Sequence, residues 1–513
     1  MNDLQFLMNE MLLTLKQLFS GNIIDNIIRL LEYNPKEPLI FSSGLFLFLF
    51  LAFSFCYMLL RKRLMARLLF VTAFSYYFYY KSSGLYFGLL AFVTVSDYII
   101  GWAISKVRQR GVMARLLVTM SVTIDLALLG YFKYTNFFGE LVAQMIGNNF
   151  QPMDIFLPVG ISFFTFQSLS YTIDIYRGQL KPLPSLLDYA FYVSFFPQLV
   201  AGPIVRASDF APQIRQPLHI TREMAARGAY FIMIGLFKKA VISDYISLNF
   251  VDRIFDNPSL YSGIENLFGV YGYAMQIYCD FSGYSDMAIG IALLLGFRFP
   301  INFHAPYSAV SVSDFWRRWH ISLSTWIRDY IYISLGGNRK GAIRTYVNLI
   351  LTMLLGGLWH GASLNFVAWG GMHGVALAIH KFSRRYIFRH DKHYVSHGIR
   401  KLFAIVITFH FVCLTWIFFR NSTFAESRDM ILKIFTDFHP ELFMQMLHGY
   451  RYVFALMAFG YLTHFIPDRW QEWFIRLVSR TNFIVDAILI AIVIWIVIQV
   501  KSSEIQPFIY FQF

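Results

Sequence analysis

The chain has 513 residues, of which 57% are hydrophobic and only 14% are charged, whereas soluble domains carry about 25% charged residues. This composition excludes a soluble globular protein and indicates an integral membrane protein. The net charge of +14 comes from short basic clusters between apolar runs, a pattern that sets loop orientation in membranes, so it gives little support to nucleic-acid binding. Cys56, Cys279 and Cys413 lie far apart in apolar surroundings, which argues against a disulfide framework and against a metal site.

Residues 1–36 carry apolar side chains at roughly helical spacing and stop at Pro35. Two interpretations remain open: short amphipathic helices on the membrane face, or one additional packing helix. This segment lacks the basic, apolar and small-residue order of a cleavable signal peptide, so we expect the mature chain to begin at Met1. We treat residues 1–36 as an N-terminal extension and residues 37–513 as one transmembrane domain.

Long apolar segments predict an all-α polytopic integral membrane protein with about 10–12 membrane helices. Basic clusters at 61–67, 106–115 and 384–401 are predicted to be cytoplasmic, which places the N-terminus outside. The predicted spans are 39–60, 68–80, 85–103, 116–131, 155–173, 228–247, 266–280, a region within 345–380, 402–419, 450–466 and 483–500.

The segment FYVSFFPQLVAGPIVR, residues 191–206, is apolar but short and contains Pro197, Gly202 and Pro203. These residues favour a re-entrant segment that lines a cavity, with Gln198 facing it, over a straight span. The alternative is a proline-capped turn at the interface.

Asp280 and Asp286 interrupt the apolar sequence QIYCDFSGYSDMAIGIALLLGF. Carboxylates in such a position normally pair with a cation or face water. Arg298, Arg317 and Arg318 are the candidate partners, and the pairing is either structural or part of a polar pathway.

Residues 314–344 contain six Lys or Arg and three Trp, so we expect them at a membrane surface. Read as one helix from Asp314 to Tyr332 with Ser311 or Ser313 as its cap, the segment brings His320 and several guanidiniums to one neighbourhood. Guanidiniums bind phosphate in a bidentate way, which predicts a cytoplasmic phosphate-bearing ligand; the alternative is that the cations only fix topology. The candidate residues for binding such a ligand are Trp316, Arg317, Arg318, Trp319 and Arg328, with further cations at Arg339, Lys340 and Arg344.

His360 lies in GGLWHG, inside a sequence apolar enough to enter the bilayer. An imidazole there can accept a proton at neutral pH, or it can be a hydrogen-bonding strut between helices. The neighbouring residues predicted to line a tunnel or to pack helices are Asn348, Gly356, Gly357 and Trp359, together with Gln198 and Asp280.

Four motifs, DFWRRWHISLSTW, GGLWHG, FFPQLVAGPIVR and QIYCDFSGYSDMAIGIALLLGF, resemble those of the membrane-bound O-acyltransferases, in the branch of the alginate O-acetylation membrane proteins. The resemblance covers roughly residues 40–470, with its motif core at 191–380. The chain is also similar, more distantly, to the protein that transfers D-alanine to teichoic acids. The family resemblance implies a multi-helix shell around a central tunnel, with His360 as the family's invariant histidine and His320 as its second. The first 36 residues depart from the branch.

The resemblance implies transfer of an acyl group, acetyl above all, from a cytoplasmic thioester such as acetyl-CoA to a hydroxyl of an exported polysaccharide. It also implies a bacterial inner membrane location, no permanently bound cofactor, and an extracytoplasmic hydrolase-like partner. No Gly-x-Ser-x-Gly motif occurs, so a covalent Ser intermediate within the chain is not indicated. The alternatives are D-alanyl or other acyl transfer, and, in another class, a non-catalytic exporter or scaffold.

Overall fold

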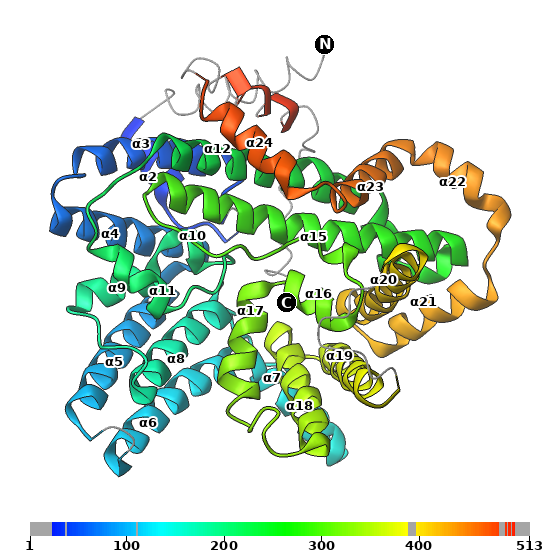
Figure 1. The fold of residues 1–513 in the computed structure, drawn as a ribbon, viewed down its shortest axis with the longest axis horizontal. Coiled ribbons are helices and arrows are strands. Elements are labelled where there is room, and N and C mark those ends of the chain that lie inside the picture. Colours follow the sequence, from blue (N-terminus) through cyan, green and yellow to red (C-terminus); the bar gives the residue numbers. More distant parts are fainter. Residues whose placement is uncertain are drawn as a thin grey trace.

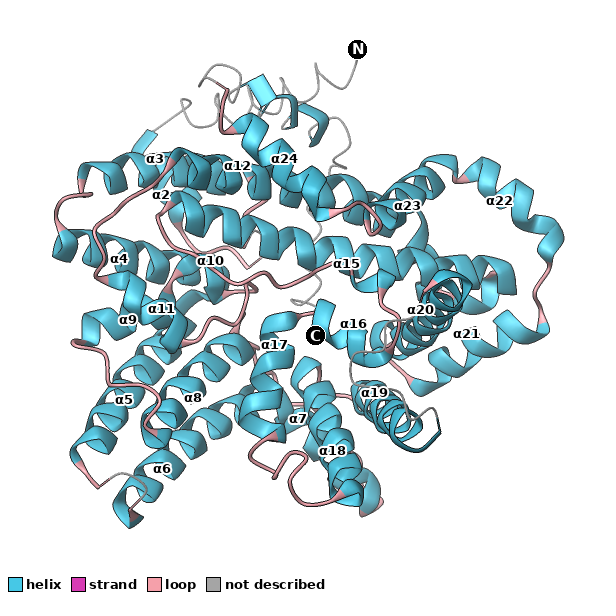
Figure 2. Cartoon of the chain, in the orientation of Figure 1, coloured by secondary structure: helices cyan, strands magenta, loops and turns pink. Residues whose placement is uncertain are grey.

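The computed structural model describes residues 23–35, 38–108, 111–387, 397–481, 488–489, 491–493 and 495–497. All regular elements in these ranges are helices, which confirms the predicted all-α class (Figure 2). Within the predicted extension, α2 (Ile23–Leu31) is helical, while residues 1–22 lie outside the described part. Most of the predicted span 483–500 also lies outside it.

The N-terminal half begins with α3 (Gly44–Leu59) and α4 (Leu64–Ser83), and a bundle of α5 (Phe87–Lys106), α6 (Val112–Leu129) and α8 (Ile161–Arg177) follows, at the lower left of Figure 1. The connection from α6 continues through the π-helical turn Gly130–Tyr134 into α7 (Thr135–Met145). Helix α4 is longer than the predicted 68–80. It continues because Lys81 donates its Nζ protons to the Leu30 and Glu32 carbonyls, so the charge inside the helix is satisfied.

The segment 191–206 is broken, as its prolines predict. Helix α9 (Leu186–Ser194) ends before Phe195, and the short α10 (Phe196–Leu199) follows at once. Every residue from 191 to 205 is buried. Helix α11 (Ala207–Ile214) then leads the chain back toward the surface.

Helix α15 (Gly263–Leu294) crosses the whole molecule beside α12 (Arg222–Leu236) (Figure 1). The predicted end at residue 280 is therefore wrong. The helix continues because the two carboxylates in its apolar part are paired with lysines of the π-helical turn Phe237–Ser243: Lys239 lies 2.5 Å from Asp280, and Lys238 lies 2.7 Å from Asp286. The predicted arginine partners, Arg298, Arg317 and Arg318, are replaced by these lysines.

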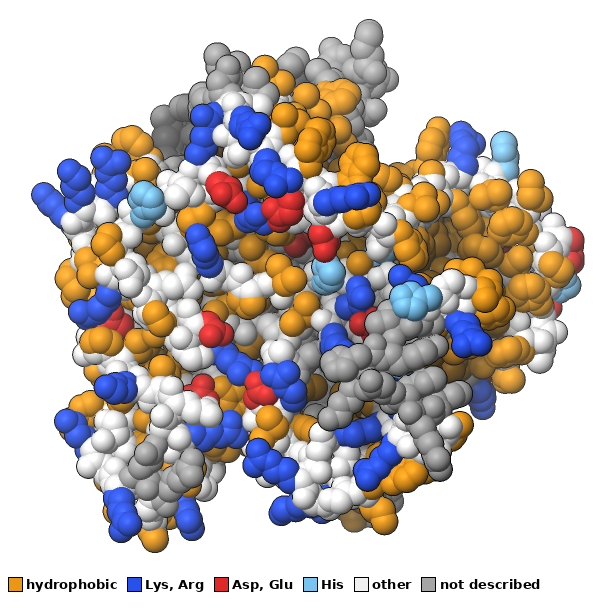
Figure 3. Space-filling model, in the orientation of Figure 1, with side chains coloured by type: hydrophobic (Ala, Val, Ile, Leu, Met, Phe, Trp, Pro, Cys, Tyr) orange, Lys and Arg blue, Asp and Glu red, His pale blue; other side chains and the backbone are white. Residues whose placement is uncertain are grey.

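The C-terminal half contains α16 (Val312–Arg318), α17 (Ile321–Trp326), α18 (Ala342–His360), α19 (Leu364–Phe382), α20 (Gly398–Arg420), α21 (Phe424–Thr436), α22 (Phe443–Gly449), α23 (Arg451–Thr463) and α24 (Asp468–Val478). Four stretches of the described residues are long and apolar enough to cross a membrane: Leu64–Lys106, Val112–Met145, Ala342–His360 and Gly398–Arg420. Hydrophobic side chains cover much of the surface over α21–α23, whereas Lys and Arg lie along the left and lower edges and across the middle of the view (Figure 3). The protein is an integral membrane protein.

Candidate active site

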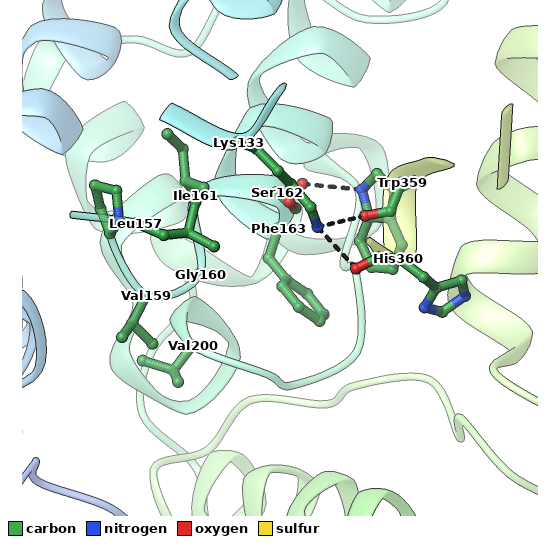
Figure 4. A pocket seen from close by; sticks show the side chains of 11 residues that line it. Lys133, Leu157, Val159, Gly160, Ile161, Ser162, Phe163, Val200, Trp359 and His360 are labelled. Atoms are coloured by element: carbon green, nitrogen blue, oxygen red, sulfur yellow. Dashed lines mark hydrogen bonds between the residues drawn. The ribbon is translucent and has the colours of Figure 1, made fainter. Parts of the chain in front are cut away.

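His360 is the last residue of α18, and only 3% of it is exposed. Its imidazole lies among aromatic rings, with centroids 5.0 Å from Trp359, 5.0 Å from Trp369 and 5.3 Å from Phe419. Figure 4 shows the ring pointing away from the small cavity that the backbone of His360 lines. The imidazole is therefore directed into the protein and shielded from bulk water.

His320 is fully buried, and its ring centroid lies 6.4 Å from that of His360. The predicted continuous helix from Asp314 to Tyr332 is wrong, because His320 has a left-handed backbone (φ +43°) between α16, capped by Ser311, and α17. Such a conformation is uncommon for a residue with a side chain and is found preferentially at functional sites. In an intact helix the face of His320 would adjoin the face of Arg317 and Arg328, and the break at His320 removes this predicted arrangement.

The hydrogen bonds of His320 determine which ring nitrogen carries the proton. Its Nδ1 lies 3.3 Å from Asn302 Oδ1, an oxygen that also accepts from the Ser322 hydroxyl at 2.8 Å. Because an amide oxygen can only accept, Nδ1 must donate, and the lone pair is on Nε2. Among the described residues Nε2 has no hydrogen-bond partner. Burial lowers the pKa of His320 to about 3, so the ring is uncharged at neutral pH.

Two cavities lie at opposite ends of α8. The smaller one, of ≈ 80 Å³, is lined by Gly160–Phe163 at the start of the helix and by Lys133, Trp359 and His360 (Figure 4). The larger one, of ≈ 1010 Å³, is lined by Asp174 and Arg177 near the end of the helix. With a rise of 1.5 Å per residue, the two ends are roughly 20 Å apart.

Three aromatic side chains lie between the two cavities. Trp326 stacks on Phe166 with ring centroids 3.7 Å apart, and Phe166 lies 5.4 Å from Trp359, the neighbour of His360. Trp326 also donates its indole proton to the Phe166 carbonyl at 2.9 Å. The family resemblance implies a continuous tunnel, which stays a prediction. Such a tunnel would have to pass around these three rings.

The larger cavity is rich in arginine. The guanidiniums of Arg177 and Arg206 lie 5.1 and 5.2 Å from the Tyr330 ring centroid, and Arg339 lines the same space. Arg206 pairs with Asp329 at 2.7 Å. Burial would raise the pKa of Asp329, but its hydrogen bonds to Arg328 and Arg206 hold it below the ordinary value, so this group is a carboxylate. The sequence analysis missed Arg177 and Arg206, which are about thirty positions apart in the chain.

The arginines predicted to bind the phosphate-bearing donor do not lie together in one cavity. Arg318 pairs with Asp314 at 3.0 Å, and Arg317 is exposed; neither lines the two cavities. Arg328 lies beside the larger cavity because it pairs with Asp329 at 2.6 Å.

Trp316 and Trp319 are packing residues. Trp316 donates its indole proton to His373 Nδ1 at 3.2 Å, and His373 Nε2 then donates to Thr415 at 3.0 Å. Trp319 is 1% exposed and stacks on Phe315, with ring centroids 5.6 Å apart. The two tryptophans join α16 to α19 and α20, behind His320.

Three of the predicted tunnel or packing residues make local structural contacts. Gln198 donates to the Tyr192 carbonyl at 2.6 Å, inside the broken segment 191–206. Asn348 donates to the Gly337 carbonyl at 3.1 Å and so attaches the loop of residues 336–338 to α18. Asp280 ties α15 to Lys239, as described above.

Gly357 allows α18 and α19 to approach each other closely. A Cβ atom at Gly357 would lie 2.2 Å from the Phe366 carbonyl oxygen, whereas one at Gly356 would meet only Ile327 Cδ1, at 3.7 Å. We therefore expect Gly357→Ala to destabilise the fold by about 1–3 kcal/mol or more, as overpacking does. Gly356→Ala, the matched control, should change stability by less than about 0.5 kcal/mol. Thermal unfolding of both purified variants in detergent measures the difference, and equal midpoints would contradict it.

A profile of the membrane-bound O-acyltransferase (MBOAT) family matches residues 176–419, which include His320 and His360. The chain is similar to "Probable alginate O-acetylase AlgI" of Pseudomonas syringae pv. tomato, with 40% identity over 443 residues, covering 85% of this chain and 83% of that protein. It is also similar to "Peptidoglycan O-acetyltransferase" of Helicobacter pylori, with 38% identity over 427 residues, covering 77% and 79%. The "Teichoic acid D-alanyltransferase" of Bacillus subtilis is 30% identical over 286 residues, covering 53% and 71%. The chain thus belongs to the membrane-bound O-acyltransferase family.

Proposed function

We propose that this protein transfers an acetyl group from a cytoplasmic thioester to a hydroxyl of an exported or cell-surface polysaccharide. The observation that carries the proposal is the pair of buried histidines, His320 and His360, with ring centroids 6.4 Å apart. Both side chains are buried and shielded from bulk water. The names of the P. syringae and H. pylori relatives favour acetyl as the group and a polysaccharide as the acceptor.

The chemistry needs little from the protein because a thioester is already activated. His360 acts as the general base that takes the proton from the acceptor hydroxyl, while the oxygen attacks the thioester carbonyl carbon. The C–O bond forms, the C–S bond breaks, and the proton passes to the departing thiolate. Buried rings around His360 exclude water that would otherwise hydrolyse the thioester, and the rigid ends of α17 and α18 align the reactants.

The larger cavity is our candidate donor site. Arg177, Arg206 and Arg339 offer guanidiniums to the phosphates of a carrier such as coenzyme A, with which Arg groups form bidentate hydrogen bonds. This cavity lies at the end of the bundle that carries the exposed cations of the 106–115 loop and of Arg339–Arg344. By the positive-inside rule this is the cytoplasmic side of a bacterial inner membrane.

The acceptor reaches His360 from the opposite, extracytoplasmic side, directly or through a hydrolase-like acetyltransferase partner. D-alanyl transfer is the second candidate, favoured by the similarity to the B. subtilis protein. A non-catalytic exporter or scaffold is the alternative of another class.

The test is a reconstitution of the full chain in proteoliposomes with acetyl-CoA labelled in the acetyl group. We expect thioester loss together with label on an added polysaccharide or on the partner protein. A D-alanyl thioester on its carrier protein, supplied in a parallel sample, separates the second candidate from the first. Movement of polysaccharide across the membrane without thioester loss from either donor would contradict the proposal.

A further inference from the structure

The helix that carries His360 ends abruptly. Gly361, the residue after His360, is extended (φ −158°, ψ 152°), and its N–H donates to Gly357 at 3.3 Å as the last bond of the helix. The carbonyls of Leu358, Trp359 and His360 therefore have no partner within α18, as is usual for the last turn of a helix.

All three carbonyls instead accept hydrogen bonds from two adjacent residues of another segment. Tyr134 Oη donates to the Leu358 carbonyl at 2.6 Å. Lys133 Nζ donates to the carbonyls of Trp359, at 2.7 Å, and His360, at 2.9 Å (Figure 4). Both residues end the π-helical turn Gly130–Tyr134, and such turns occur frequently at functional sites.

A lysine suits this position for two physical reasons. Its ammonium has three protons to donate and no acceptor, so one side chain can satisfy two carbonyls at once. Its amino group also lies at the negative end of the dipole of α18, which favours the protonated form there. Lys133 lies just beyond the predicted end of the fourth span at Tyr131, and its sequence context indicates no role for it.

We propose that Lys133 is a positioning residue for His360: it fixes the main chain of the base from outside the helix that carries it. This inference rests on the proposed role of His360 as the general base. The rings of Trp359 and Trp369 flank the imidazole, and the backbone of His360 fixes the point from which that ring extends. A shift of about 1 Å in a catalytic group can cost about 10²-fold in rate.

The decisive variant is Lys133→Met, which keeps the apolar stem and removes the donors. In the full chain we expect kcat for acetyl transfer to fall about ten- to hundredfold, with the KM for donor unchanged, because the arginine cavity is at the other end of α8. Lys133→Arg, which keeps charge and donors, should recover most of kcat. If Lys133→Met fails to insert, Lys133→Gln, with one amide donor group, gives the same comparison.

Lys81→Met is the matched control. Lys81 likewise donates to two backbone carbonyls at a helix end, but these are the carbonyls of Leu30 and Glu32 at the end of α2. The same substitution there should lower the unfolding midpoint and leave kcat unchanged. This control separates loss of a helix-end contact from misplacement of the base.

A double variant tests whether Lys133 acts through His360. Adding Lys133→Met to His360→Gln should cause no further loss, because residues that act as one unit are not additive. A further tenfold loss, a near-native kcat in Lys133→Met, or a raised KM for the acceptor alone would each overturn the inference. Near-native turnover in the single variant His360→Gln would instead remove the proposed function, so the two failures are distinguishable.

Discussion

Replacing His360 with glutamine is expected to lower acyl-transfer turnover by about a hundred- to ten-thousand-fold, the usual contribution of a general base. Glutamine occupies a similar volume and can hydrogen-bond, but it cannot take a proton from the acceptor hydroxyl. The variant should fold and insert normally. Donor affinity should change little, because the arginine-rich cavity is roughly 20 Å away along α8.

The measurement is single-turnover and steady-state acetyl transfer by purified His360→Gln, beside a binding titration with coenzyme A. His464→Gln is the control, because His464 is also buried, at 5% exposure, but its Nδ1 donates to the Gly460 carbonyl of α23, at 3.0 Å, rather than lying in α18. It should keep near-native turnover. If His360→Gln keeps near-native transfer as well, the base is not His360, and His320 with its Nε2 lone pair becomes the next candidate.

Removing the guanidinium of Arg177 or Arg206 is expected to weaken donor binding about ten- to a hundredfold. A hydrogen bond to a charged group contributes about 1.5–3 kcal/mol, and each 1.4 kcal/mol is a factor of ten in affinity. Both side chains lie against Tyr330 in the ≈ 1010 Å³ cavity, so Arg177→Gln and Arg206→Gln should act on the same ligand.

Calorimetric titration with coenzyme A and with pantetheine, which lacks phosphates, tests this assignment. The two variants should lose affinity for coenzyme A and bind pantetheine as the unmodified protein does. Arg428→Gln, a change at a surface residue paired with Asp429, is the neutral control. The sequence-based assignment makes the opposite prediction, namely that Arg317→Gln and Arg318→Gln weaken donor binding. Unchanged coenzyme A affinity in both cavity variants would contradict the site proposed here.

The positions of most helices could be predicted because hydropathy and residue spacing are local properties. The predicted spans 85–103 and 402–419 correspond to α5 and α20 within a few residues. The break at 191–206 could also be predicted, because Pro197 and Pro203 restrict the backbone wherever they occur.

The sequence was a poorer guide to which charged residues pair with one another. Asp280 and Asp286 were expected to need cations, and they have them, but the cations are Lys239 and Lys238 on a different helix. Sequence distance gives no measure of spatial distance for such pairs, because tertiary packing alone brings residues forty positions apart into contact. The same reason explains why Arg177, Arg206 and Lys133 were not recognised.

The sequence by itself determined that this is a membrane protein, that it is helical, that it carries the motifs of the membrane-bound O-acyltransferases, and that His320 and His360 are its candidate catalytic residues. Only the tertiary structure decided how those histidines are presented. In the folded protein the left-handed backbone of His320 interrupts the predicted helix, and both imidazole rings lie close together in the buried interior. Hydrogen bonds from Lys133 and Tyr134 hold the end of α18. The physical reason is that a motif records which side chains are present, whereas the orientation of each depends on backbone strain and on hydrogen bonds from segments far away in the chain.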